Sequence, residues 1–162
     1  MTATPPMLKL EAFLPYRLSI LAEAVSQSLA GVYRRRYGIA IPEWRVLATL
    51  GQFDSMTAKE IGLHSRMHKT KVSRAVATLE ERRLVRRHTN NRDMRESFLE
   101  LTSAGRRIYN ELVPEALGFV DRLLAPLSEE ERTALEPLLQ RLTERAFELN
   151  DRMGERPDGG GG

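Results

Sequence analysis

The 162-residue sequence contains no cysteine, and its aromatic residues are few: one tryptophan, four tyrosines and five phenylalanines. Without cysteine, disulfide bonds, thiolate metal sites and cysteine-based redox chemistry are all excluded. No apolar run approaches the roughly 20 residues of a membrane-spanning helix. The Met-Thr-Ala-Thr-Pro-Pro start also lacks the charged and apolar segments of a secretion signal. We therefore expect a soluble cytoplasmic protein that does not contact a membrane.

Catalytic motifs are also missing. There is no phosphate-cradling glycine loop and no serine in a nucleophile-elbow setting, and the acidic residues are spread over helix caps and solvated faces. His64 and His68 are spaced to bind zinc if both lie on one helical face, but Ser65 replaces the expected glutamate and a turn is predicted between them. The sequence predicts neither an enzyme nor a metal or cofactor site.

Positive charge is concentrated in one segment. Residues 64–95 hold ten basic and three acidic side chains, a net charge of +7, although the whole chain carries only +3. Residues 102–153 hold seven arginines and ten acidic residues. Local concentration of one sign indicates a site for a polyanion, whereas a uniform excess would bear mainly on solubility.

The basic segment begins with the pattern of two helices and a turn. Thr57 and Glu60 form a capping box that starts a short helix, which the run from Gly62 to Ser65 is expected to interrupt. A second helix is predicted over residues 68–82. Its apolar stripe comprises Val72, Ala75, Val76 and Leu79. On the opposite face the side chains are small apart from one arginine, and lysines flank them. These are Thr70, Ser73, Arg74 and Ala77, with Lys69 and Lys71 at the edges.

Small side chains allow a helix to approach base edges in the major groove. The two helices therefore predict a helix-turn-helix whose second helix reads DNA. Residues 85–89 and 97–101 follow as two strands of a hairpin, and the turn between them carries Arg92 and Arg95. A basic hairpin beside a reading helix can place arginine in the neighbouring minor groove.

The remaining chain is predicted to be helical. A long helix runs from Pro15 to Tyr37 and stops at Gly38, and another runs from Pro42 to about Phe53. Thr102 and Ser128 cap two further helices, which Pro114 and Pro137 should bend. The expected organisation is a flexible arm (1–12), a dimerisation helix (13–38), a DNA-binding lobe (39–101), C-terminal dimerisation helices (102–153) and a disordered tail (154–162).

Three segments together resemble the MarR family of winged-helix transcription regulators. They are Leu-Glu-Glu-Arg-Arg-Leu-Val-Arg-Arg at 79–87, Asp-Met-Arg at 93–95 and Leu-Glu-Leu-Thr-Ser-Ala-Gly at 99–105, within a resemblance that covers residues 13–149. It implies a mainly α fold with a small β-hairpin wing, and a homodimer that binds double-stranded DNA at a pseudo-palindromic operator. Members are usually repressors released by a small ligand. Arg83 replaces the usual glycine, so the reading helix is expected to lack its left-handed cap.

The resemblance and the charge pattern together define the candidate site residues. The predicted phosphate contacts are Arg66, His68, Lys69, Lys71, Arg86 and Arg87. The predicted base contacts are Thr70, Ser73 and Arg74. By position, Asp93 and Arg95 match the family's wing acid and minor-groove arginine, and Arg92 can replace an arginine that Met94 displaces. The predicted effector residues are Tyr16, Arg17, Tyr37 and Trp44.

Family members often respond to phenolic or aromatic acids, and some to coenzyme A thioesters. The segments Phe-Leu-Pro-Tyr-Arg-Leu at 13–18 and Ile-Pro-Glu-Trp-Arg-Val at 41–46 resemble the branch associated with aromatic-acid catabolism. The three arginines at 34–36 either stabilise the negative end of their helix or bind an anion. An architectural DNA-binding protein without an effector is the alternative, and it would lack a cavity between the first helix and the lobe. Binding to single-stranded RNA is disfavoured because the basic region offers only Phe98 for stacking.

Overall fold

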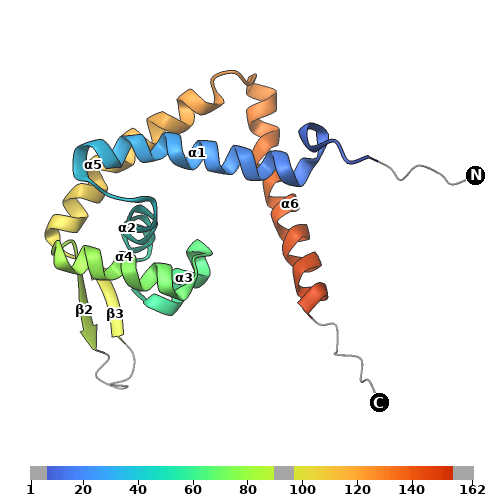
Figure 1. The fold of residues 1–162 in the computed structure, drawn as a ribbon. Coiled ribbons are helices and arrows are strands. Elements are labelled where there is room, and N and C mark those ends of the chain that lie inside the picture. The colour runs from blue at the N-terminus through green and yellow to red at the C-terminus, as the bar shows by residue number, and fades with distance from the viewer. Residues whose placement is uncertain (1–6, 90–96, 155–162) are drawn as a thin grey trace, which may run out of the picture. The chain divides into compact units, whose positions relative to one another are not determined.

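The computed structural model describes residues 7–89 and 97–154, so Arg92, Asp93 and Arg95 lie outside the described residues. It is mostly helical with a small antiparallel sheet, which confirms the predicted fold class (Figure 1). The elements in order are η1 (Leu10–Ala12), α1 (Leu14–Tyr37), α2 (Ile41–Phe53), β1 (Ser55–Thr57), α3 (Ala58–Ser65), α4 (Lys69–Glu81), β2 (Val85–Thr89), β3 (Ser97–Leu101), α5 (Ser103–Leu124) and α6 (Glu129–Gly154).

Helix α1 has the predicted limits. Pro15 lies in its first turn, where a missing N–H costs nothing. Gly38 ends the helix in the left-handed conformation, with φ of 61°, and its N–H bonds to the carbonyl of Arg34. Only Ala30 and Tyr33 of this helix are buried. The apolar side chains of its first half are therefore exposed in the single chain.

Helix α3 starts at the predicted capping box. The Thr57 hydroxyl accepts the Glu60 N–H at 3.2 Å, and the Glu60 carboxylate accepts the Thr57 N–H at 2.7 Å. The expected interruption at Gly62 is wrong, because α3 continues through it to Ser65. The glycine instead lets the chain after the helix pack closely, since a Cβ there would lie 3.2 Å from the Met67 carbonyl oxygen. Arg66, with φ of 53°, makes the turn that leads to α4.

The predicted strands at 85–89 and 97–101 are confirmed, and they pair antiparallel as β2 and β3. A third strand, β1, was not predicted. It pairs with the other edge of β3, with Met56 opposite Leu99, so that β3 is the central strand. Three residues are too few to reveal an alternating pattern, and β1 forms because β3 offers it an edge.

The end of α4 differs from expectation. Arg83 itself adopts the left-handed conformation, with φ of 58°, and the Leu84 N–H closes the helix on the Leu79 carbonyl at 2.9 Å. The left-handed cap is therefore present without its usual glycine. An arginine in this conformation costs about 1–2 kcal/mol, because its Cβ crowds the following carbonyl oxygen.

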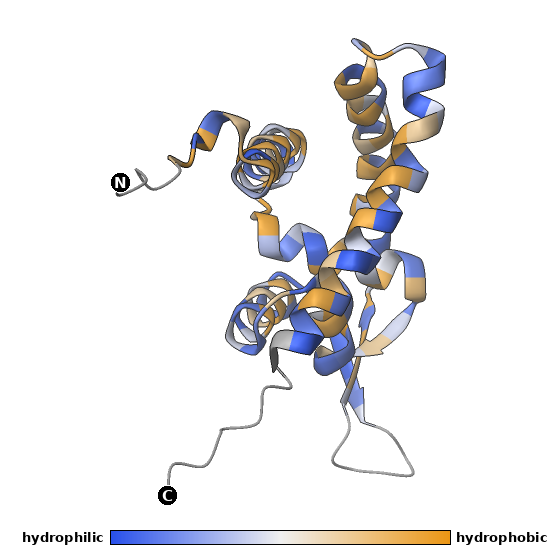
Figure 2. Cartoon of the chain, turned by 90° about the vertical axis from the view of Figure 1, so that its right-hand side faces the viewer, coloured by the Kyte–Doolittle hydropathy of each residue, from blue (hydrophilic) through white to orange (hydrophobic). Residues whose placement is uncertain are grey.

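The lobe formed by α2 to β3 contains most of the buried core. Hydrophobic segments (orange) alternate with hydrophilic ones (blue) along the helices of the chain (Figure 2). The largest fully buried side chains are Tyr33, Ile39, Leu47, Leu50, Ile61, Leu79, Leu99 and Leu112. Trp44 is partly buried against this core, as its predicted packing role requires.

Helix α5 packs on the lobe through two glycines. A Cβ on Gly105 would lie 2.0 Å from the Leu84 carbonyl oxygen, and one on Gly51 would lie 2.3 Å from the Tyr109 ring. Thr102 caps α5 as predicted, its hydroxyl accepting the Gly105 N–H at 3.1 Å. No larger residue fits at position 105 unless the backbone moves.

The chain forms two compact units, one up to Phe119 and one from Val120 onward, so their boundary lies within α5. The predicted capping box at Ser128 opens α6: the Ser128 hydroxyl accepts the Glu131 N–H at 3.2 Å. Helices α5 and α6 continue through Pro114 and Pro137. No α6 side chain that the structure describes is buried. None of the described helices combines the length and apolar character of a membrane span.

Candidate nucleic-acid interface

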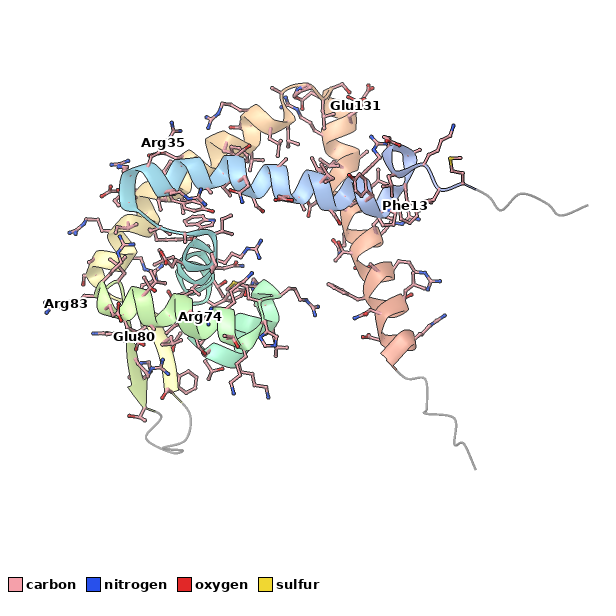
Figure 3. All side chains as sticks on the ribbon, in the orientation of Figure 1. Phe13, Arg35, Arg74, Glu80, Arg83 and Glu131 are labelled. Carbon is pink, nitrogen blue, oxygen red and sulfur yellow. The ribbon has the colours of Figure 1, made fainter. Side chains whose placement is uncertain are left out.

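Helix α4 presents the face that the sequence predicts. Val72, Ala75, Val76 and Leu79 are buried in the lobe, whereas the opposite side is open to solvent. Arg74 projects from the middle of the helix, and Glu80 and Arg83 mark its far end (Figure 3). The exposed residues of this face and its edges are Lys69, Thr70, Lys71, Ser73, Arg74 and Ala77.

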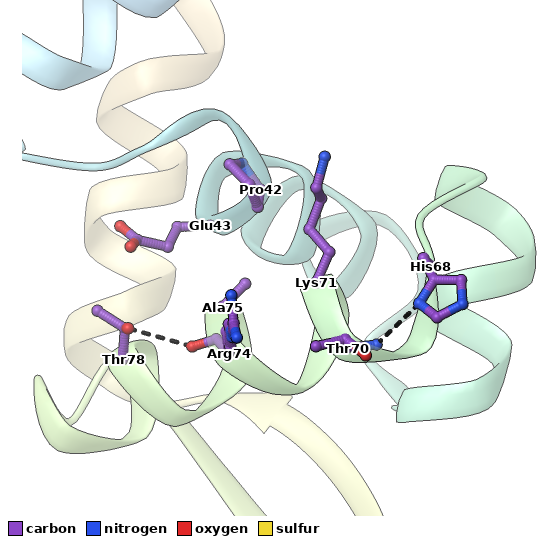
Figure 4. A pocket seen from close by; sticks show the side chains of 8 residues that line it. All are labelled: Pro42, Glu43, His68, Thr70, Lys71, Arg74, Ala75 and Thr78. Atoms are coloured by element: carbon purple, nitrogen blue, oxygen red, sulfur yellow. Dashed lines mark hydrogen bonds between the residues drawn. The ribbon is translucent and has the colours of Figure 1, made fainter.

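The exposed side of α4 lies between two hollows. One, of about 470 Å³, separates α4 from the start of α2, and it is lined by Pro42, Glu43, His68, Thr70, Lys71, Arg74, Ala75 and Thr78 (Figure 4). The other, of about 460 Å³, separates α4 from α3, and it is lined by Ala58, Lys59, Gly62, Leu63, Met67, Lys69, Val72 and Ser73. The helix therefore stands out as a ridge, a shape that suits entry into a groove of DNA.

His68 caps α4. Its Nδ1 accepts the Thr70 N–H at 3.4 Å, which replaces a bond that the first turn of a helix lacks (Figure 4). The neighbouring Lys71 extends toward α2, and Thr70 lies on the first turn of α4 beside His68 (Figure 4). The structure thus brings the predicted base-contacting residues together, and it places Lys71 at the edge of that group.

The wing strands carry basic residues that are already paired within the chain. Arg86 donates to Glu100 through Nε at 2.5 Å, and the Arg87 guanidinium lies 3.2 Å from a Glu80 carboxylate oxygen. His88 stacks on Phe98 with ring centroids 5.8 Å apart. Exposed pairs of this kind contribute little stability, so a phosphate could replace the carboxylate as partner.

His64 and His68 were considered as zinc ligands because of their spacing. In the structure the two side chains make different local contacts. His64 packs edge-on to Phe53, with centroids 4.8 Å apart, whereas His68 caps α4. Among residues 7–89 and 97–154 no three histidine or acidic side chains are grouped to hold a metal ion.

The four predicted effector residues lie apart in one chain. Tyr16 and Arg17 are at the start of α1, and Tyr37 is its last residue, about 30 Å away at 1.5 Å per residue. Trp44 stacks on Tyr33 at 5.2 Å, and burial raises the pKa of Tyr33. A single chain cannot place all four around one small molecule.

A groove does separate α1 from the lobe. It encloses about 390 Å³ and is lined by Ala22, Glu23, Ser26, Gln27, Ile41, Pro42, Arg45, Met67 and Lys71. None of the four predicted effector residues lines it. Ile41, Pro42 and Arg45 belong to the segment 41–46 whose resemblance was noted above, but the other lining residues come from α1 and from the region of α3 and α4, so no single motif identifies the groove.

Sequence reasoning also missed two arginines that bind backbone carbonyl groups. Arg106 of α5 donates to the Gly51 carbonyl at 2.8 Å and pairs with Asp54 at 2.8 Å. Arg82, counted only as charge, donates to the carbonyls of Tyr37 and Gly38. No local pattern could reveal these contacts, since each joins residues more than 40 positions apart.

The helix-turn-helix of α3 and α4 and the adjoining β2–β3 wing define a winged-helix DNA-binding protein. The sequence profile of the MarR family matches residues 37–96. The uncharacterized HTH-type transcriptional regulator YwoH of Bacillus subtilis is 31% identical over 104 residues, which cover 64% of this chain and 75% of YwoH. The chain belongs to the MarR family of DNA-binding transcription regulators.

Solved structures agree with this assignment. The MarR family regulator SPO1453 of Silicibacter pomeroyi is 28% identical with a TM-score of 0.74, and the match covers 86% of this chain and 99% of SPO1453. Sco3205 of Streptomyces coelicolor, solved in complex with DNA, has the same fold at 22% identity and a TM-score of 0.74, with 97% of this chain and 95% of that chain covered. The winged-helix fold and the regulator class predicted from the sequence are confirmed.

Proposed function

We propose that the protein is a homodimeric repressor that binds a pseudo-palindromic operator and leaves it when a small acidic ligand binds. The observation that carries the DNA-binding part is the exposed, basic ridge of α4 between two hollows. In a twofold dimer the two α4 helices would enter successive major grooves, roughly 34–36 Å apart.

The residue roles follow from position on the ridge. Thr70, Ser73 and Arg74 lie opposite the buried stripe and would contact base edges. The phosphate contacts would come from exposed side chains around the ridge and on the wing: Arg66, His68, Lys69, Lys71, Arg86 and Arg87. Arg92 or Arg95, with Asp93 orienting the guanidinium, would enter the minor groove.

A homodimer is supported by apolar side chains that one chain leaves uncovered. In α1, Leu18, Ile20 and Leu21 are 42%, 51% and 56% exposed. In α6, Leu138, Leu139 and Leu142 are 51%, 45% and 49% exposed. A second copy supplies matching apolar faces, and burying the exposed half of each side chain would contribute about 1 kcal/mol. The resemblance to the MarR family, which implies a homodimer, also supports a second copy of this chain as the partner that covers these faces.

The groove between α1 and α2 favours an effector-responsive regulator over an architectural DNA-binding protein. Its volume of about 390 Å³ is within the range of small-molecule sites. Arg45 and Lys71 line it together with one acidic residue, Glu23, so two cations outnumber one anion beside the apolar side chains of Ile41, Pro42 and Met67, a combination that suits an aromatic acid. NadR, which has this fold at 23% identity and a TM-score of 0.70, with 85% of this chain and 96% of that chain covered, was solved with 4-hydroxyphenylacetate.

Selection from random duplexes tests the DNA-binding proposal. The purified protein should enrich a two-part site whose halves are related by a dyad and separated by about one helical turn. The proposal is wrong if no sequence is enriched over bulk DNA, or if a single half-site binds as tightly as the pair.

Thermal-shift screening of aromatic acids and their thioesters tests the effector proposal. A compound that binds only the native state raises the melting temperature as its concentration rises. The same compound should lower the affinity for the selected operator. A stabilising acid with no effect on operator binding would contradict its role as the releasing ligand.

A further inference from the structure

Arg82 links the end of the reading helix to the end of α1. It follows the last residue of α4, and its guanidinium donates to the Tyr37 carbonyl at 2.5 Å and to the Gly38 carbonyl at 3.3 Å. A carboxylate oxygen of Glu43, near the start of α2, lies 3.8 Å away. The last carbonyl groups of a helix lack partners within it and carry partial negative charge, so a guanidinium suits them well.

The same turn of α1 is bound to α5. Arg36 pairs with Glu115 at 2.8 Å and with Glu111 at 3.0 Å, and the Tyr37 hydroxyl donates to Glu111. The hydrogen bond to Glu111 is the largest cause that raises the pKa of Tyr37, and the neighbouring Tyr37 in turn raises the pKa of Arg36. The carbonyl of Tyr37 is thus bound to α4 and its hydroxyl to α5.

Arg82 belongs to the basic segment, and its simplest role would be one more phosphate contact. The geometry gives another role, because both terminal nitrogens of the guanidinium donate within the chain and its side chain is only 34% exposed. The guanidinium nitrogens are held in one plane. An arginine that donates to two backbone carbonyls therefore fixes the orientation of its own helix end relative to those carbonyls as well as the distance between them.

We propose that Arg82 is a positioning residue for operator recognition. Its bonds to Tyr37 and Gly38 fix the direction of α4 relative to α1. This inference rests on the proposed function, in which α1 belongs to the dimer interface. The separation of the two reading helices in the dimer then depends on the bonds that Arg82 makes in each subunit.

The test measures affinity for operators of different half-site separation. Operator duplexes are the selected sequence and versions with one base pair inserted or removed between the halves, titrated by fluorescence anisotropy at several salt concentrations. The variants are Arg82→Ala and Arg82→Lys. The matched control is Arg83→Gly, which removes the same charge one residue away and keeps the left-handed turn.

Wild-type protein should bind the altered operators much more weakly than the selected one. Arg82→Ala should weaken binding to the selected operator by about tenfold, the size expected for lost hydrogen bonds to a charged group. It should also lose most of the preference for half-site separation. Arg82→Lys keeps the charge and can reach one carbonyl, so it should recover part of that preference, and Arg83→Gly should retain all of it.

Each contrary outcome has a separate meaning. If Arg82→Ala keeps the full preference for separation, or if the slope of log affinity against log salt falls by about 0.9 as for a lost phosphate contact, the inference is wrong while the proposed function stands. If wild-type protein shows no preferred operator, the proposed function and the inference both fail. Should Arg82→Ala unfold, Arg82→Lys decides the question by the same comparison.

Discussion

The DNA-binding lobe and the α6 helix differ in how their apolar residues are covered. The lobe buries Leu47, Leu50, Ile61 and Leu79 completely within one chain. Helix α6 has a comparable set of leucines, yet Leu138 and Leu142 remain about half exposed. The core of the lobe is therefore closed within one chain, with Tyr33 of α1 and Leu112 of α5 completing it, whereas α6 leaves an apolar face uncovered. The buried core lies in the region for which DNA reading is proposed, and assembly is expected from another region.

The largest effect is expected from opening the core of the lobe. Leu50 is fully buried, and Leu50→Ala should lower the free energy of unfolding by about 2–5 kcal/mol, because the removed atoms leave a cavity. Urea denaturation followed by circular dichroism gives the value. A loss below about 1 kcal/mol would mean that the lobe does not depend on this core.

A charge introduced on the apolar face of α6 should dissociate the dimer without unfolding the lobe. Leu142→Glu should weaken association by about 3 kcal/mol or more, because a twofold dimer loses the contact twice. Light scattering and operator titration measure the result, which should be a monomer with weak operator binding. Thr133→Glu adds the same charge on the opposite face of α6 and should remain dimeric. If Leu142→Glu is as dimeric as that control, α6 is not the assembly surface.

Substitutions on the exposed side of α4 should change DNA reading and leave stability alone. Arg74→Ala should cost about 1–3 kcal/mol on the operator and relax discrimination at one base pair. Lys69→Ala should weaken all sequences alike and lower the salt slope by about one. Equal discrimination by wild-type and Arg74→Ala proteins would remove the base-contact role from Arg74.

The smallest effect concerns the turn between α4 and the wing. Arg83 occupies the left-handed region, which glycine enters at no steric cost. Arg83→Gly should therefore stabilise the lobe by about 1 kcal/mol. Thermal melting should report a rise of a few degrees, with the oligomeric state unchanged. A lower melting temperature would show that the arginine side chain contributes more than its backbone costs.

The sequence was informative where structure is set by neighbouring residues. The capping boxes at Thr57 and Ser128, the stop at Gly38 and the limits of β2 and β3 all follow from local rules, and all are confirmed. Gly62 misled the prediction, because tertiary packing of the following turn overrode its weak helix preference.

Contacts between distant segments could not be predicted. Strand β1 exists only because β3 presents an edge, and Arg82 finds its carbonyl partners 44 and 45 residues away. The exposed face of α4 was predictable because one helix contains it. The groove beside α1 was not, since three separate segments line it. The roles of the individual DNA and effector residues stay predictions.

The contact between Gly105 and the Leu84 carbonyl has a mechanical consequence. The backbone of Gly105 lies so close to the backbone of Leu84 that the space between them holds the hydrogen atom of the glycine but no Cβ atom. The first turn of α5 consequently has no freedom to slip past the start of β2. If a bound molecule turned the first turn of α5 about the helix axis, the start of β2 would therefore have to move with it.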